Sequence, residues 1–240
     1  MIKVGLMGAK GRMGKVIAHL LDSEYSAHTK LAVTADKGDD FKAILEAEVV
    51  IDFSSPSGLV ELAKAALGLD KSLPSFVVGS TGWKIDDRKV LEDLSKKTQV
   101  ILSSNFSLGV LALHEILKQA SPLLEKLHYL PVIVETHHRH KKDSPSGTAI
   151  SLQRTIAPAG PGNVQTHSIR AGEVIGDHEV NFYGASDRIT IAHSAQDRAI
   201  FGRGAIDAAL WLVERRKGSH SVHGMLSMEQ YFREKILCLS

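Results

Sequence analysis

The sequence has little cysteine, few aromatic residues and no excess of charge of either sign. Cys238 is its only cysteine, which excludes a disulfide within the chain and a zinc site built on several cysteine ligands. Twenty-nine Lys and Arg residues against 27 Asp and Glu residues leave a formal charge of +2. We therefore expect no binding to nucleic acid or to a membrane surface through general charge, and any anion must be bound by a local site.

Long hydrophobic runs are missing as well. The first residues, MIKVGLMG, form too short an apolar run for a signal peptide, and no stretch reaches the ~18 apolar residues of a membrane span. Together with the single cysteine, this predicts a soluble, unprocessed, cytoplasmic protein. Hydrophobic residues make up 43% of the 240 residues, enough to form the core of one large domain or two small ones.

The first hundred residues alternate short β-branched runs with helical patterns. Strands are expected at 2–7, 31–35, 48–53, 75–78 and 99–103. Helices are expected between them at 13–21, 41–45, 57–67 and 86–95. This alternation predicts an α/β fold with a doubly wound, Rossmann-type parallel sheet, covered on both faces by helices.

Beyond residue 108 the pattern changes. A long amphipathic helix is expected at 110–127. The residues expected to contribute to its buried stripe are Leu111, His114, Ile116, Leu117, Leu123, Leu124 and Leu127. The elements expected after it are a strand at 131–135, a helix at 147–156 and strands at 164–171, 178–183 and 188–194. Because these last strands follow one another without helices, we expect them to pair antiparallel in a separate α+β unit.

A further helix, expected at 202–215, is predicted to return to the first half of the chain. The first domain is then discontinuous. We expect a dinucleotide-binding domain of residues 1–107 and 199–240, with an inserted α+β domain of residues 108–198.

Three glycines, Gly8, Gly11 and Gly14, follow the first expected strand directly. Their spacing allows a sharp turn, a close approach of backbone N–H groups to a pyrophosphate, and tight packing of the next helix on the sheet. The N-terminus of that helix would face the anion, with Arg12 adding charge. A tight strand-to-helix turn that binds nothing remains an alternative.

Asp36 ends the second expected strand, at the position where an acidic residue binds the ribose of a dinucleotide. Lys37, next to it, would pair with a 2′-phosphate. A carboxylate and an ammonium side by side predict a site that accepts both NADH and NADPH. An ordinary turn carboxylate and a solvated charge pair are the alternatives.

Small and polar residues follow the other expected strands, at 52–56, 79–82 and 103–107. In doubly wound folds, ligands bind beyond the carboxyl ends of the strands. Backbone groups at 79–81 and 104–106 would therefore line a nicotinamide. Turn chemistry alone explains any single segment, but all three together favour a cofactor site.

Six potentially cationic side chains stand in succession at 137–142, in the order His-His-Arg-His-Lys-Lys. Mutual repulsion lowers their pKa values toward the range useful for proton transfer. A helix opens next at Ser146, Gly147 and Thr148, and its free N–H groups and a hydroxyl would bind a carboxylate. The combination predicts a pocket for a dicarboxylate substrate.

Three other interpretations of this segment compete. A zinc site lacks a cysteine or an HExxH pair to complete it, so no metal is expected. A nucleic-acid contact lacks interleaved aromatic residues. A solvated loop before a capped helix remains open.

The chain resembles the 4-hydroxy-tetrahydrodipicolinate reductase (dihydrodipicolinate reductase) family over nearly its whole length. The most specific motif is E-x-H-H-R-H-K-x-D-x-P-S-G-T at 135–148. The other matching segments are G-x-x-G-R-M-G at 8–14, I-D-F at 51–53, G-S-T-G at 79–82, N-F-S at 105–107, R-A-G-x-x-x-G-x-H at 170–178 and R-x-x-F-x-x-G-A at 198–205.

This resemblance implies hydride transfer from NADH or NADPH to a cyclic imine with two carboxylates, in lysine and diaminopimelate biosynthesis. It implies that His137 donates or accepts a proton, that Lys141 is a proton donor, and that His138, Gly147 and Thr148 bind a carboxylate. It also implies that the inserted domain binds substrate and forms a homotetramer through its sheet. The positions that it assigns to the cofactor are Gly8, Ala9, Lys10, Gly11, Arg12, Met13, Asp36, Lys37, Gly79, Ser80, Thr81, Ser103, Ser104, Asn105 and Phe106.

The sequence departs from the family pattern in two short segments and one residue. The stretches 36–48 and 157–163 are abbreviated, and an aspartate stands at position 36 where glutamate is frequent. Two other functions remain as alternatives: a dehydrogenase of another dicarboxylate or imino acid, and a dinucleotide sensor without catalytic activity.

Overall fold

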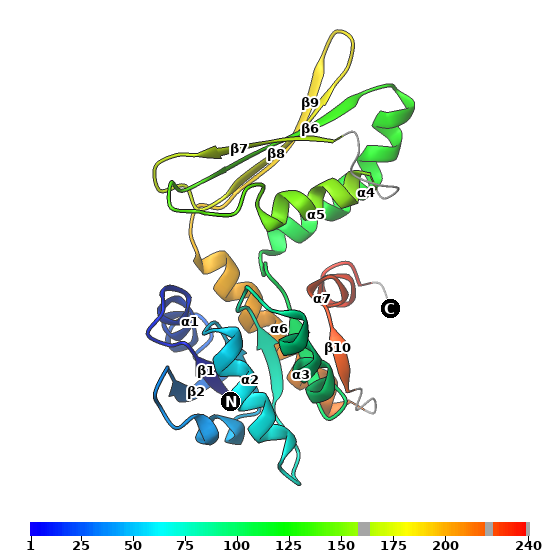
Figure 1. Ribbon diagram of the computed structural model, residues 1–240. Helices are drawn as coiled ribbons and strands as arrows, with labels where there is room; N and C mark the ends of the chain where they lie inside the picture. Colours follow the sequence, from blue (N-terminus) through cyan, green and yellow to red (C-terminus); the bar gives the residue numbers. More distant parts are fainter. Residues whose placement is uncertain (158–163, 219–222, 239–240) are drawn as a thin grey trace. The chain divides into compact units, whose positions relative to one another are not determined.

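The computed structural model describes residues 1–157, 164–218 and 223–238. Two compact units make up the chain, as Figure 1 shows: Met1–Phe106 with Ala199–Ser240, and Ser107–Arg198. The abbreviated connection at 157–163 lies, after its first residue, outside the described residues. None of the helices in the described ranges has the length and apolar character that a bilayer span requires.

The first unit contains a six-stranded sheet in which every neighbouring pair is parallel. Its strands are β1 (Ile2–Met7), β2 (Thr29–Ala35), β3 (Val49–Asp52), β4 (Ser75–Val78), β5 (Gln99–Leu102) and β10 (Gly224–Leu226). Their order is β10-β5-β4-β3-β1-β2, so the chain leaves β1 in one direction for β2 and returns on its other side with β3. The prediction of a doubly wound parallel sheet is confirmed, with its switch point between β1 and β3.

Helices cover both faces of this sheet. They are α1 (Arg12–Asp22), the 3₁₀ helix η1 (Phe41–Glu46), α2 (Pro56–Leu67), α3 (Ile85–Ser95), α6 (Ala199–Lys217) and α7 (Met228–Lys235). On one face α1 packs against α6, where Gly202 permits close contact because a Cβ there would be 2.7 Å from Leu20 Cδ1. On the other face η1, α2 and α3 pack over the sheet around fully buried Leu59, Phe76 and Leu91.

Hydrophobic periodicity located most of these elements to within two residues. The weak pattern at 41–45 forms a 3₁₀ helix, and the helix expected at 202–215 extends over Ala199–Lys217. Sequence reasoning missed β10 and α7. A strand of three residues is too short to show a period, and α7 is mostly polar, with Met228, Tyr231 and Phe232 buried.

The second unit is a four-stranded mixed sheet with two helices. Its elements are α4 (Leu108–Lys126), β6 (Leu130–His137), α5 (Gly147–Ile156), β7 (Gln165–Arg170), β8 (Asp177–Tyr183) and β9 (Arg188–Ser194). The strand order is β7-β6-β8-β9. The expected antiparallel pairing holds for β8 with β9, but it is wrong for β7, which pairs parallel with β6. The reason is that α5 lies between β6 and β7 and forms the crossover that a parallel pair needs.

The core of the second unit lies between α4, α5 and one face of this sheet, with Ile133, Leu152 and Phe182 almost completely buried. The buried stripe of α4 includes Leu117 and Leu124.

The expected stripe on α4 was wrong for Ile116, Leu123 and Leu127, which are 52%, 60% and 58% exposed. A helix buries an apolar stripe only about 100° wide, and α4 carries more apolar residues than this stripe holds.

Candidate active site

All five loops with candidate cofactor residues follow strands of the parallel sheet in the first unit. Since these strands are parallel, their carboxyl ends lie at one edge of the sheet. The loops after β1 and β3 are in direct contact at the switch point. A Cβ on Gly8 would lie 2.7 Å from the carbonyl oxygen of Phe53. The structure therefore brings these candidate residues to the edge where doubly wound folds bind ligands.

The glycine loop is shaped by close backbone packing. Gly8 has a φ of +79°, which disfavours any residue with a side chain. A Cβ on Gly14 would be 2.0 Å from the carbonyl oxygen of Gly8, so the first turn of α1 lies directly on the loop. Gly11 is the N-cap, and no side chain in the described residues caps this helix. Arg12 and Lys10 are exposed beside it. A backbone cradle at an uncapped helix N-terminus fits the pyrophosphate of a dinucleotide.

Asp36 connects the end of β2 to the glycine loop. Its carboxylate accepts a hydrogen bond from Lys10 N, with distances of 3.1 and 3.3 Å to its two oxygens. The backbone N–H of Asp36 donates to Asp39 Oδ2 at 2.9 Å. Lys37 is exposed next to it. The acidic residue and the phosphate loop are thus in contact, as a site for an adenosine ribose requires.

A buried carboxyl group connects the loops after β3 and β4. Asp52 is fully buried and accepts hydrogen bonds from Ser80 Oγ at 2.6 Å, from Ser54 N at 3.1 Å and from Ser54 Oγ. Burial raises the pKa of Asp52, and these hydrogen bonds oppose that effect. The ring of Phe53 lies over Gly79, where a Cβ would be only 2.4 Å from it. Asp52 therefore fixes two of the candidate cofactor loops, while Thr81 beyond them is exposed.

The loop after β5 has its own internal hydrogen bonds. Ser103 Oγ donates to the carbonyl oxygen of Asn105 at 2.6 Å and accepts from Asn105 N at 3.2 Å. The side chain of Phe106 is 1% exposed, and Gly204 of α6 lies against its carbonyl, where a Cβ would be 1.9 Å away. Phe106 can therefore offer a ligand only its backbone, whereas Ser104 is exposed.

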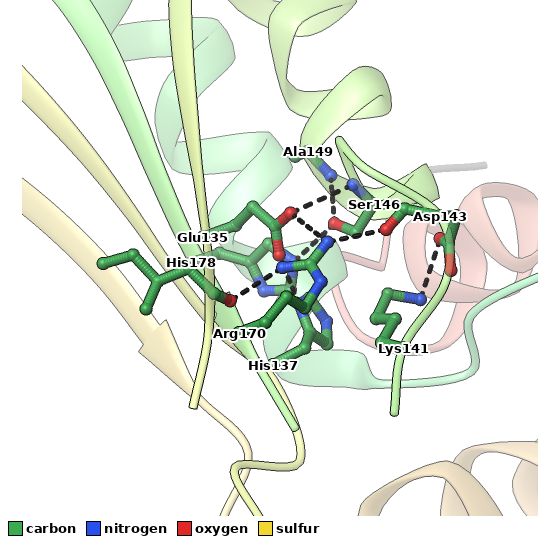
Figure 2. A network of polar contacts seen from close by, with 9 residues as sticks. Glu135, His137, Lys141, Asp143, Ser146, Ala149, Arg170 and His178 are labelled. Carbon is green, nitrogen blue, oxygen red and sulfur yellow. Dashed lines mark hydrogen bonds and ion pairs between the residues drawn. The ribbon is translucent and has the colours of Figure 1, made fainter. Parts of the chain in front are cut away.

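The histidine segment lies in the second unit, where β6 ends (Figure 2). His137 is the last residue of the strand and is 7% exposed. Its Nδ1 is hydrogen-bonded to Glu135 Oε2, and its ring stands edge-on to that of His178, with centroids 5.1 Å apart. Lys141 lies on the following loop and forms an ion pair with Asp143 at 2.8 Å.

The other cationic residues of the segment are arranged differently. Arg139 and His140 are exposed, as is Lys142, while His138 is half-buried with its ring 6.3 Å from that of His140. The expected crowding of six charges is therefore only partial. Burial, more than repulsion, lowers the pKa of His137; Lys141 and Arg170 add to this effect, and Glu135 opposes it.

Glu135 is at the centre of the polar network in Figure 2. Its side chain is fully buried, and its Oε1 accepts hydrogen bonds from Arg170 Nη2 at 2.8 Å and from Ser146 N at 3.2 Å. Burial alone would raise its pKa, but Arg170, Ser168 and His137 hold the pKa of Glu135 at about 2. The carboxylate is therefore ionised at neutral pH.

Ser146 caps the N-terminus of α5. Its Oγ accepts from Ala149 N at 3.2 Å and lies 3.2 Å from His178 Nε2, so this hydroxyl is already used within the protein. Gly147 is exposed, and no described atom lies within 4 Å of where its Cβ would be. Thr148 is half-buried. Space for an anion is therefore available at the first residue of the helix.

Sequence reasoning missed the roles of Glu135, Asp143, Arg170 and His178 in this network, and that of Asp52 in the first unit. Only Glu135 carried a local signal, because residues two apart on a strand face the same side. No group of three or more His, Cys, Asp or Glu side chains in the part of the chain that the structure describes is placed to hold a metal ion.

Family models of dihydrodipicolinate reductase match almost the entire chain. The model of the N-terminal part matches residues 2–106, and that of the C-terminal part matches residues 109–228. The chain belongs to the dihydrodipicolinate reductase family. This membership confirms the resemblance inferred from the motifs.

Curated relatives in this family are similar along their whole length. A 4-hydroxy-tetrahydrodipicolinate reductase of Campylobacter jejuni is 35% identical over 95% of this chain and 100% of its own. One of Bdellovibrio bacteriovorus is 36% identical over 94% of this chain and 96% of its own. The fold also matches that of a dipicolinate-bound dihydrodipicolinate reductase from Paenisporosarcina sp. TG-14, with a TM-score of 0.69, 19% identity and coverage of 95% and 97% of the two chains.

Proposed function

We propose that the protein reduces 4-hydroxy-tetrahydrodipicolinate to tetrahydrodipicolinate with NADH or NADPH and with loss of water, in lysine and diaminopimelate biosynthesis. The observation that carries this proposal is the arrangement of His137. A buried imidazole is held at Nδ1 by an ionised carboxylate, at the start of a loop that bears Lys141 and ends at the N-terminus of α5. Membership of the reductase family supports it.

His137 is the proposed group for proton transfer. Because burial lowers its pKa, the imidazole is neutral at neutral pH, and its Nε2 can accept a proton. An anionic substrate next to the ring raises the pKa again and favours the imidazolium, which can then donate the proton. Lys141, positioned by Asp143, is the proposed second proton donor and meets the substrate.

The start of α5 is the proposed carboxylate site, formed by Gly147, Thr148 and His138. Backbone N–H groups in the first turn of a helix point toward an anion, and the helix dipole favours negative charge there. Ser146 contributes by fixing the first turn, through its hydrogen bond from Ala149 N.

The loops at the carboxyl edge of the parallel sheet are the proposed cofactor site. The reduced nicotinamide supplies the hydride. The glycine loop at 8–13 binds the pyrophosphate, Asp36 and Lys37 bind the adenosine ribose or its 2′-phosphate, and the backbone at 79–81 and 103–106 positions the nicotinamide. Because a carboxylate and an ammonium both stand at the ribose position, we propose that NADH and NADPH are both used.

The proposed roles of His137 and Lys141 can be tested by substitution. We expect His137→Gln and Lys141→Ala each to lower kcat by about 100-fold or more, the usual worth of a general acid or base, without weakening NADPH binding. Lys142→Ala is the matched control, because this neighbouring lysine is exposed. Loss of NADPH affinity equal to the loss of kcat, or equal effects at Lys141 and Lys142, would contradict the assignment.

Competition with pyridine-2,6-dicarboxylate separates the two enzymatic interpretations. A reductase of the proposed substrate is inhibited competitively by this planar analogue, and less by open-chain dicarboxylates. A dehydrogenase of another dicarboxylate or imino acid would show the opposite order. A dinucleotide sensor would bind NADPH and turn over none of the substrates.

We also propose a cytoplasmic homotetramer that assembles through the sheet of the second unit. The face of this sheet opposite Ile133 carries half-buried Val132 and Val134 and, on β7, Ile169 with 46% exposure. An apolar sheet face of this kind is suited to association with another copy. Light scattering after gel filtration should give four times 26.0 kDa for the wild type and a smaller species for Ile169→Asp.

A further inference from the structure

Glu135 is not among the residues proposed to transfer a proton or to bind substrate, although burying its charge is costly. A carboxylate removed from water loses several kcal/mol of solvation, which only close partners can restore. Glu135 is fully buried and ionised, and both of its oxygens are engaged: Oε2 with His137 Nδ1, and Oε1 with Arg170 Nη2 and Ser146 N.

The bond from Oε2 determines the state of the imidazole. An ionised carboxylate can only accept hydrogen bonds, so a neutral His137 must carry its proton on Nδ1 and leave a lone pair on Nε2. The same charge stabilises the imidazolium when Nε2 takes up a proton.

A glycine lies beside Nε2 of His137. Gly176 precedes β8, and a Cβ there would be 3.0 Å from His137 Nε2 and 3.7 Å from His178 Cε1. Ala195 N donates to the carbonyl oxygen of Gly176 at 2.9 Å and holds this segment in place. Any residue with a side chain at position 176 would be in close steric contact with Nε2 of His137.

The hydrogen bonds to Oε1 connect Glu135 to α5, the helix whose start is the proposed site for a substrate carboxylate. Ser146, whose N–H donates to Oε1, is also the N-cap of α5. Arg170 donates both to Oε1 and, at 2.6 Å, to the carbonyl oxygen of Asp143. The loop from 138 to 146 is therefore fixed to Glu135 near its end, next to the pair of Lys141 and Asp143.

We propose that Glu135 is a positioning residue of the reductase: it holds His137 as the Nδ1–H tautomer, stabilises its protonated form, and sets the start of α5 relative to that ring. This inference rests on the proposed function, because it assigns Glu135 to the histidine that transfers the proton.

Three other titratable groups face His137. Arg170 approaches from β7, Lys141 from the loop, and His178 from β8. The first two lower the pKa of His137, and the pKa of His178, lowered to about 4 chiefly by burial, keeps that ring neutral at neutral pH. Glu135 is the carboxylate that opposes Arg170 and Lys141 at the ring.

Glu135→Gln is the most informative substitution, since it preserves shape and removes the charge. Its amide oxygen can still accept from Arg170 and Ser146, which turns the NH₂ group toward His137 Nδ1. The ring must then accept at Nδ1 and carry its proton on Nε2, which is the wrong tautomer for accepting a proton there. Glu125→Gln is the matched control, because Glu125 is an exposed glutamate on α4 of the same unit.

Steady-state kinetics should separate positioning from folding. We expect Glu135→Gln to lower kcat about 100-fold or more and to leave the Kd of NADPH unchanged. The basic limb of its pH–kcat/KM profile should move to lower pH by about 1 pH unit or more, because the imidazolium loses its stabilising charge. Wild-type kcat and an unmoved limb, as in Glu125→Gln, would overturn the proposal.

A measurement on the wild-type chain makes the test independent of variant folding and of substrate. Nitrogen-15 NMR of histidine-labelled protein reports which ring nitrogen carries the proton, and His137→Gln identifies the signal. We expect the Nδ1–H form; the Nε2–H form would overturn the positioning role even if the enzyme is active. If instead the protein does not turn over the substrate but shows Nδ1–H, the proposed function fails and the tautomer assignment stands.

Discussion

His178 should make the stability of the protein depend on pH in a measurable way. This side chain is 4% exposed, stands edge-on to His137 and lies 3.2 Å from Ser146 Oγ. Burial, with a smaller contribution from His137, lowers the pKa of His178 from 6.5 to about 4. Between these two pKa values, His178 is protonated in the unfolded chain and mostly neutral in the folded protein.

The sign and size of the effect follow from this difference. A histidine with a lowered folded-state pKa destabilises the native protein as the pH falls below 6.5, and the loss is complete near the folded pKa. With values of 6.5 and about 4, the free energy of unfolding falls by about 2 kcal/mol between pH 7 and pH 5. Glu135, with a pKa lowered to about 2, stabilises the folded protein while it is ionised, and this stabilisation is lost only in more acidic solution.

The assay is urea unfolding of the wild type and of His178→Gln at pH 7 and pH 5. Glutamine cannot take up a proton, so the variant should lose about 2 kcal/mol less than the wild type between the two pH values. His137 and His193, whose pKa values are also lowered by burial, are common to both proteins and largely cancel. His28→Gln, which replaces an exposed histidine just before β2, should behave as the wild type. Equal losses in the wild type and His178→Gln would refute the reasoning.

Two further predictions concern the cofactor loops. Gly14 and Gly58 both occupy the third position of a helix, but a Cβ on Gly14 would lie 2.0 Å from Gly8 O, whereas one on Gly58 has ordinary contacts from 3.5 Å outward. Gly14→Ala should therefore lower the stability by about 1–3 kcal/mol and weaken NADPH binding. Gly58→Ala should raise the stability by up to about 1 kcal/mol. Equal melting temperatures of Gly14→Ala and Gly58→Ala would contradict both expectations. Asp52→Asn replaces one of the two acceptor oxygens of this side chain by an NH₂ group, so one of the serine hydroxyls that donate to Asp52 loses its acceptor. We expect the Kd of NADPH to rise about tenfold in a fluorescence titration. An unchanged Kd would contradict this prediction.

The fold of the first unit was predictable because its signals are local. A strand buried on both faces appears as a short β-branched run, and β1 and β4 were located to the residue. The glycine loop was recognisable because backbone contacts as close as that of Gly14 exclude other residues.

What sequence reasoning missed depends on contacts between distant residues. The sequence does not show that β7 pairs with β6 and not with β8, although the helix between β6 and β7 was expected. Glu135 lies 35 residues from Arg170 and 11 from Ser146, so its partners could not be inferred from spacing. Burial lowers the pKa of His137 more than the neighbouring charges do. Spacing could not show this, because it does not reveal that His137 is buried while Arg139 and Lys142 are exposed.

The central claim is that this chain is a reductase of 4-hydroxy-tetrahydrodipicolinate. The most direct test is the absorbance at 340 nm of NADH or NADPH mixed with the purified protein, with and without the aldol product of pyruvate and aspartate semialdehyde. We expect a loss of absorbance only when this product is present. No loss with either nucleotide would contradict it.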